Sequence, residues 1–241
     1  MAPSPTPTIV LVHGAFADAS SYARVIPELL ADGFPVVAPA VPNRSLIGDA
    51  AYIASVVRQI PGPVVLVGHS YGGAVITVAG VEDNVRALVY LAGYALEQGE
   101  SLGELQGRFP DSDLASALLY TPFPIEGSTE TGTDVTVDAT RFPAIFAADV
   151  EPELTAVLAV SQRPLAAQAF ADAAPAAAWK TTPSWGLIAA DDHTINPDVE
   201  RFGYQRAGMT TTEVPSSHLV MLAHPKKVAE LIREAARATA Q

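Results

Sequence analysis

The residues with the clearest chemical potential lie in the motif GHSYG at positions 68–72, which fits the pattern G-x-S-x-G. The apolar run Val64–Val67 comes directly before the motif, and the apolar segment Tyr71–Gly80 completes and follows it. This order predicts a strand, a sharp turn and a helix, with Ser70 on the turn. Such a turn exposes the hydroxyl, and the N–H groups at the start of the helix can stabilise a developing negative charge. We therefore predict that Ser70 is a nucleophile.

A serine hydroxyl needs a base to remove its proton, and the base needs an acid to orient it. Among five histidines, His218 follows the last predicted strand, Thr210–Val214, after a short turn. That position suits the base. His224 lies at the start of the predicted terminal helix, while His13 ends the first predicted strand and His69 lies inside the motif. We interpret His224 as a helix-start residue, and His13 and His69 as residues that shape the backbone.

Two neighbouring aspartates are candidates for the acid. Asp191 and Asp192 follow the predicted strand Ser184–Ala190. Neighbouring side chains at a strand end point in different directions, so only one of the two can face the histidine. Together with His193 they could also be considered as metal ligands, but they lack the spacing of a recognised metal motif. We expect neither a metal nor a cofactor.

The loop after the first predicted strand is expected to complete the site. Gly14 lets the backbone turn after Thr8–His13, and the N–H of Ala15 would then face the pocket. The N–H of Tyr71, at the start of the helix after the motif, would supply a second donor. These two backbone amides are the predicted oxyanion hole.

The elements that must position these residues alternate between strand and helix patterns. Such alternation predicts an α/β fold, with a mostly parallel sheet of about six strands and helices on both faces. We treat residues 1–241 as a single domain. The expected strands cover residues 8–13, 34–38, 64–67, 87–91, 184–190 and 210–214. The expected helices cover residues 20–32, 49–60 with Asp49 as the cap, 71–80 and 197–207, and a last helix starts at Pro225.

The alternation stops over residues 95–183, which are rich in alanine, proline and aromatic residues. We predict that this segment is a lid of short helices and loops without strands of its own. Large apolar residues in and near it are candidates to line a substrate pocket: Phe16, Tyr94, Phe123 and Phe146.

Composition limits the partners and the compartment. The chain has 241 residues, 49% of them hydrophobic and 17% charged, a formal net charge of −12 and no cysteine. Such a charge would repel nucleic acid and anionic membranes, so the expected partner is a small molecule. Met1–Thr8 does not read as a signal peptide, and no apolar stretch is long enough for a membrane span. We expect a cytoplasmic monomer or homodimer, with a mature secreted form left open.

Taken in order, the motifs resemble those of a known group. VLVHGAF, GHSYGG, D-x-T-I and SHLVMLAHP are similar to segments of the small α/β-hydrolases related to plant methylesterases, salicylate-binding esterases and hydroxynitrile lyases. The resemblance covers nearly the whole chain and is weakest across residues 95–183. It implies that Asp192, three residues before Ile195, is the acid and that His218 is the base.

Departures within the group bear on the reaction. The lyases carry a threonine after the first-loop histidine and a lysine after the base, where this sequence has Gly14 and Leu219. Dehalogenases and epoxide hydrolases carry an aspartate where this sequence has Ser70. The resemblance therefore implies a carboxylesterase acting on small or medium hydrophobic esters. Lactone, thioester or C–C hydrolysis, perhydrolase or lyase chemistry, and a non-catalytic ligand-binding protein remain alternatives.

Overall fold

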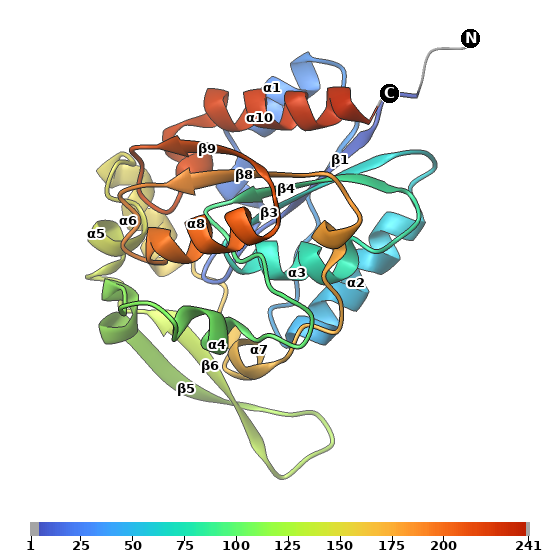
Figure 1. Cartoon of the computed structure of the whole chain (residues 1–241). Coiled ribbons are helices and arrows are strands. Elements are labelled where there is room, and N and C mark those ends of the chain that lie inside the picture. Colours follow the sequence, from blue (N-terminus) through green and yellow to red (C-terminus); the bar gives the residue numbers. More distant parts are fainter. Residues whose placement is uncertain (1–4, 240–241) are drawn as a thin grey trace.

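Six strands form one parallel sheet in the computed structural model, which describes residues 5–239 (Figure 1). Their order is β2-β1-β3-β4-β8-β9, and every neighbouring pair is parallel. Residues 1–4, part of the stretch in which no signal peptide is expected, lie outside the described residues. The strands are β1 (Thr8–Val12), β2 (Val36–Val37), β3 (Val64–His69), β4 (Val85–Leu91), β8 (Ser184–Ala189) and β9 (Thr210–Val214). The predicted α/β architecture is confirmed.

Helices cover both faces of the sheet (Figure 1). Strands β1 and β3 are buried along their whole length, so both of their faces need an apolar cover. One face carries α1 (Ile26–Ala31) and α10 (Pro225–Ala238), and the other carries α2 (Leu46–Arg58), α3 (Tyr71–Ala79) and α8 (Pro197–Arg206). The short α9 (Val220–Ala223) precedes α10. Within the described part of the chain, no helix has the length and apolar composition needed to cross a membrane.

Two of the predicted helices start differently in the structure. Helix α2 begins after Ser45, whose hydroxyl accepts the N–H of Gly48 at 3.0 Å, so the predicted cap Asp49 is wrong. Asp49 lies instead in the first turn, fully buried, and accepts the phenol of Tyr71 at 2.6 Å. The helix predicted over residues 20–32 is divided into the 3-10 helix η1 (Ala19–Tyr22) and α1.

The segment between β4 and β8, residues 92–183, contains strands, contrary to the prediction of helices and loops alone. β5 (Leu118–Pro124), β6 (Thr131–Val137) and β7 (Leu165–Ala166) form a separate antiparallel sheet. Two prolines in β5 and polar alternate positions in β6 hid this hairpin, because proline weakens a strand pattern and most of β5 is exposed. The segment also holds α4 (Leu102–Gln106), η2 (Asp113–Ala117), α5 (Phe142–Phe146), α6 (Pro152–Val160), α7 (Gln168–Ala171) and η3 (Ala178–Lys180).

Glycines let the backbone around Ser70 pack closely. A Cβ on Gly72 would lie 2.4 Å from the carbonyl oxygen of Val12 on β1. A Cβ on Gly68 would lie 2.4 Å from the carbonyl oxygen of Gly72 itself. Both distances are far inside van der Waals contact with rigid backbone atoms. The turn from β3 into α3 can therefore form against β1 only with glycine at these two positions.

We expect Gly72→Ala to destabilise the protein. The added methyl group must displace the backbone of β1, and overpacking of this kind costs about 1–3 kcal/mol or more. In a chain of this size, that free-energy loss lowers the Tm by roughly 2–12 °C. Gly103→Ala in α4 is the matched control, because its Cβ would meet nothing closer than 3.4 Å. Equal Tm values for the two variants, measured by calorimetry, would contradict this account of the turn.

Candidate active site

Ser70 is held on a strained turn between β3 and α3. Its φ of 55° and ψ of −123° lie in a region that residues with a side chain rarely adopt. The N–H of Ser70 donates to the carbonyl of Leu91 at 3.1 Å, and its own carbonyl accepts N–H groups from Gly73 and Tyr94 at 2.9 and 3.2 Å. Bonds on both sides of the residue thus fix its conformation.

His218 and Asp192 form a fully buried pair. His218 Nδ1 lies 2.6 Å from Asp192 Oδ2, and both side chains are completely buried. Asp192 Oδ1 also accepts the backbone N–H groups of Thr194 and Ile195, at 2.6 and 3.0 Å. Asp191, the other candidate, is exposed. The structure therefore pairs His218 with Asp192 and not with its neighbour.

This pairing fixes the tautomer of His218. A carboxylate accepts hydrogen bonds, so Nδ1 carries the proton and Nε2 presents its lone pair. Nε2 is buried and has no hydrogen-bond partner within residues 5–239. The ring of His69, the residue before Ser70, lies 4.6 Å from the ring of His218. An unoccupied basic nitrogen thus sits next to the motif.

His69 supports the loop that carries His218. Its Nε2–H donates to the backbone carbonyl of His218 at 2.9 Å. Burial, with a smaller contribution from His218, lowers the pKa of His69 well below its ordinary value. A neutral ring that donates from Nε2 suits this purely structural contact.

His13 plays a similar part in the loop after β1. The N–H of Val41 donates to His13 Nε2 at 2.9 Å, so His13 Nδ1 carries the proton and donates to the carbonyl of Gly14, also at 2.9 Å. Burial lowers the pKa of His13 and keeps the ring neutral. A Cβ on Gly14 would lie 2.7 Å from Cβ of Ser70, so this loop packs directly against the serine.

Two backbone amides near Ser70 are available as donors. The N–H of Phe16 is occupied, because it donates to the carbonyl of Arg163 at 3.0 Å. The N–H groups of Ala15 and Tyr71 have no acceptor within the part of the chain that the structure describes. The hydrogen bond from the Tyr71 phenol to buried Asp49 fixes the first turn of α3.

One small apolar cavity borders the serine, and a larger apolar cavity shares two of its lining residues. The first, about 20 Å³, is large enough for a single water and is bordered by Ser70. Its other walls are Ala15, Phe16, Tyr71, Tyr94, Leu102, Leu114, Leu165, Phe170, Thr194 and Ile195. The second, about 310 Å³, lies within the segment 92–183, and Leu114 and Phe170 line both cavities.

The four predicted pocket residues are placed differently. Phe16 and Tyr94 line the cavity at Ser70. Phe146 is fully buried and packs edge-on against His218, with ring centroids 4.7 Å apart, so it supports the histidine rather than lining either cavity. Phe123 lies on the β5–β6 hairpin, under the guanidinium of Arg44 and over Gly132, and is not brought to the site.

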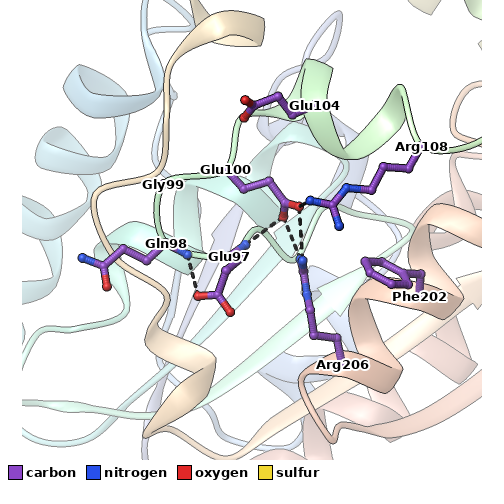
Figure 2. A pocket seen from close by; sticks show the side chains of 8 residues that line it. All are labelled: Glu97, Gln98, Gly99, Glu100, Glu104, Arg108, Phe202 and Arg206. Atoms are coloured by element: carbon purple, nitrogen blue, oxygen red, sulfur yellow. Dashed lines mark hydrogen bonds and ion pairs between the residues drawn. The ribbon is translucent and has the colours of Figure 1, made fainter.

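A larger hollow than these two lies elsewhere on the described surface and is lined by charged side chains. It measures about 570 Å³, and Figure 2 shows its walls, including Glu100, Arg108 and Arg206. These charges are already paired, because Glu100 bridges Arg206 at 2.7 Å and Arg108 at 2.8 Å. These ion pairs therefore connect α8 to the start of the segment 92–183.

The fold and the site agree with a comparison across known protein families. The family model described as the alpha/beta hydrolase family matches residues 9–231. The chain belongs to the α/β-hydrolase family. It is therefore a hydrolytic enzyme, and the predicted resemblance to this superfamily is confirmed.

Several known proteins are similar to this chain, each over a different share of its length. The alpha/beta hydrolase nvfD of Aspergillus novofumigatus (strain IBT 16806) is 26% identical, over 95% of this chain and 96% of its own. The carbendazim hydrolyzing esterase of Nocardioides sp. (strain SG-4G) is 38% identical, over 39% of this chain and 44% of its own. The crystal structure of polyneuridine aldehyde esterase has a TM-score of 0.82 and 17% identity, over 95% of this chain and 99% of that one, and so shares the fold.

Sequence reasoning missed a carboxylate that holds the histidine loop of this α/β-hydrolase. Asp149, after α5, accepts the hydroxyl of Ser216 and the N–H of Ser217, both at 3.0 Å, and the hydroxyl of Ser217. Both serines come directly before His218. Asp149 follows no strand, so nothing in its sequence context pointed to the site. The run of two serines before the histidine was the only available signal.

We expect Asp149→Ala to weaken activity and stability together. It removes an acceptor from two residues next to His218, and hydrogen bonds to a charged group contribute about 1.5–3 kcal/mol each. The predicted result is a kcat lowered about tenfold or more, by loss of histidine alignment. Glu151→Ala is the control, because its ion pair with Arg24 is exposed to solvent and therefore contributes little to stability. A wild-type kcat in Asp149→Ala would contradict the proposed support of the loop.

Proposed function

We propose that this α/β-hydrolase is a carboxylesterase in which Ser70, His218 and Asp192 act as nucleophile, base and acid. The observation that carries the proposal is the buried 2.6 Å bond between His218 and Asp192. It leaves His218 Nε2 unoccupied in a ring that packs against His69, the neighbour of Ser70 on its strained turn. Such a nitrogen can accept the proton of a serine hydroxyl.

The reaction follows from these positions. Ser70 Oγ attacks the ester carbonyl while His218 Nε2 takes its proton, and Asp192 stabilises the imidazolium. The N–H groups of Ala15 and Tyr71 hold the negative charge on the carbonyl oxygen. His218 then returns the proton to the leaving alcohol, which departs as the acyl-enzyme forms. Water, deprotonated by the same nitrogen, attacks the acyl-enzyme, and His218 returns that proton to Ser70 Oγ as the acid is released.

The cavities support a small or medium hydrophobic ester as the substrate. Both are apolar, and the larger one falls at the lower end of the volumes typical of ligand pockets, about 300–1,000 Å³. Since the space at Ser70 holds a single water, Leu114 and Phe170 must move for an ester to reach the hydroxyl. We propose that residues 95–183 serve as a lid in this way.

Residue types at two positions disfavour lyase chemistry. Gly14 offers no hydroxyl, and there is no room for a side chain against Ser70. Leu219 is buried and apolar, so no ammonium group follows His218. The names of two similar proteins, carbendazim hydrolyzing esterase and polyneuridine aldehyde esterase, agree with ester hydrolysis.

Labelling of the nucleophile tests the reaction directly. A fluorophosphonate probe should label the wild type, and p-nitrophenyl esters should be hydrolysed, while Ser70→Ala loses both signals. The control is Ser55→Ala, which should keep both signals, because Ser55 is a half-buried serine of α2 whose hydroxyl donates to the carbonyl of Tyr52. Labelling that persists in Ser70→Ala would overturn the nucleophile, and an unlabelled, inactive wild type would overturn the esterase.

Neighbouring aspartates provide a matched test of the acid. Asp192→Asn should lower kcat by about 10⁴-fold, because an amide cannot hold His218 in the required tautomer. Asp191→Asn alters the adjacent, exposed side chain and should leave kcat within about twofold of the wild type, as expected for a surface substitution. Comparable losses in both variants would contradict the assignment of Asp192.

Truncation of Phe170, which lines both cavities, should change the preference for the length of the acyl chain. Phe170→Ala joins the two cavities, so the ratio of kcat/KM for octanoate over acetate p-nitrophenyl esters should rise about tenfold, the value of one or two buried methylenes. Phe109→Ala is the control, because this similarly buried ring packs against Phe202 and lines neither cavity. An unchanged ratio in Phe170→Ala would exclude the larger cavity as the acyl pocket.

A further inference from the structure

A second acidic group lies beneath the proposed acid. Glu200, on α8, is completely buried. Its Oε2 accepts the N–H of Ala189, the last residue of β8, at 3.1 Å. Its Oε1 is also buried, and no N–H or O–H group within residues 5–239 donates to it. A single donor is poor compensation for a buried negative charge.

The carboxyl of Glu200 lies within hydrogen-bonding reach of the carboxyl of Asp192. Two buried carboxylates in contact cannot both be ionised, so they share one proton. Burial first, and then the charge of Asp192, raise the pKa of Glu200 well above its ordinary value.

The number of hydrogen bonds that each carboxyl accepts decides which of the two holds the shared proton. Asp192 accepts hydrogen bonds from the backbone N–H groups of Thr194 and Ile195 and from His218 Nδ1. Glu200 accepts one, from Ala189. The negative charge is better solvated on Asp192, so the proton stays on Glu200.

We propose that Glu200 is a positioning residue whose protonated carboxyl donates a hydrogen bond to the carboxylate of Asp192. This inference rests on the proposed function, since it extends the chain Ser70, His218 and Asp192 by one member. Asp192 already accepts three hydrogen bonds, and the added bond occupies its remaining acceptor site. This bond also draws negative charge away from the side of Asp192 that faces His218, which weakens the stabilisation of the imidazolium.

Helix α8 is anchored so that Glu200 cannot turn away. At its last residue, Arg206 donates to Glu100 at 2.7 and 3.2 Å and to the carbonyl of Ala95 at 2.8 Å, contacts at one side of the charged hollow in Figure 2. The other titratable groups around Glu200 are Tyr94, Tyr204 and Arg201. Burial raises the pKa of both tyrosines, so they stay neutral, and Arg201 is paired with Asp198 and Glu213 at the surface.

Two substitutions of Glu200 distinguish the role of a hydrogen-bond donor from the role of an ionisable carboxyl group. Glu200→Gln keeps a donor toward Asp192 and cannot ionise, whereas Glu200→Met has similar length and no donor. We expect Glu200→Gln to retain most of the wild-type kcat/KM. Glu200→Met should lose about tenfold or more in kcat, the value of a hydrogen bond to a charged group, with little change in KM. Its acid limb of kcat/KM should move to higher pH, because Asp192 then stabilises the imidazolium more strongly.

These kinetics can overturn the proposal in two ways. A Glu200→Met variant with the wild-type kcat and pH profile would show that Glu200 positions nothing. A Glu200→Gln variant as impaired as Glu200→Met would show that the carboxylate itself is needed.

Infrared spectroscopy tests the proton without any measurement of activity. The wild type minus Glu200→Gln difference spectrum at pH 7 should contain the C=O band of a protonated carboxylic acid. Glu230→Gln is the control and should leave that band unchanged, because its exposed carboxylate pairs with Lys227, which lowers the pKa of Glu230. Absence of the band from the Glu200→Gln difference would overturn the proposal.

The pH dependence of stability gives a second independent readout. The unfolded pKa of glutamate is about 4.3, and the folded pKa of Glu200 is higher. Stability due to its protonated form is therefore complete below about pH 4.3 and is lost as the pH rises toward the folded value. Between pH 5 and 7, the Tm of the wild type should fall relative to Glu200→Gln by roughly 3–5 °C per pH unit. A constant Tm difference would overturn the proposal.

These last two readouts separate the inference from the proposed function. If Ser70→Ala remained an active esterase, the proposed reaction would fail. The infrared band and the Tm slope would still decide whether Glu200 holds a proton against Asp192. Both use Glu200→Gln, so the result does not depend on the folding of Glu200→Met.

Discussion

The backbone of Ser70 is the constraint on which the rest of the site depends. A left-handed conformation at a residue with a side chain costs about 1–3 kcal/mol and persists only where the surroundings impose it. Here β1, β4 and the loop after β4 impose it through hydrogen bonds to Leu91 and Tyr94 and through the close approach of Gly72 to Val12. The same packing brings the loop of Gly14 against the serine. The turn of Ser70 and the loop that carries the N–H of Ala15 are therefore positioned together.

Polar contacts from outside the sheet then fix each participant. His13 sets the loop after β1, Asp49 sets Tyr71, and Asp149 sets the serines before His218. Each of these side chains accepts from or donates to backbone or hydroxyl groups of a neighbouring element. Such supports matter because misplacement by about 1 Å can reduce catalysis about 10²-fold. The segment 92–183 supplies Asp149 and Phe146, so it contributes to the alignment of the histidine as well as to the cavities.

Local patterns were sufficient to predict the parallel sheet. Buried strands such as β3 read as short apolar runs, and the motif at residues 68–72 identified the turn at Ser70. The choice between Asp191 and Asp192 could not be made from the residues alone, because it depends on which way two adjacent side chains point. It needed the resemblance, and in the structure it is Asp192 that contacts His218.

Other features depend on contacts between distant parts of the chain. Glu200 reads as an ordinary position on an amphipathic helix, and only the packing of α8 on β8 brings it to Asp192. The strands β5 and β6 escaped prediction because β5 is largely exposed and contains two prolines, and only Val135 and Val137 of β6 are buried. Asp49 was a plausible cap by type, and only the tertiary contact with Tyr71 shows its actual partner.

The neighbouring positions of β4 and β8 have a consequence for how this protein can diversify. These strands pair directly, although residues 92–183 separate them in the chain. Because the two strands are parallel, the excursion leaves the sheet at the carboxyl end of β4 and re-enters it at the amino end of the neighbouring strand β8. Its length and sequence can drift without disturbing the register of any strand. In the proposed esterase, selection can thus exchange the part that meets the substrate wherever Asp149 and Phe146 keep their contacts with the histidine loop.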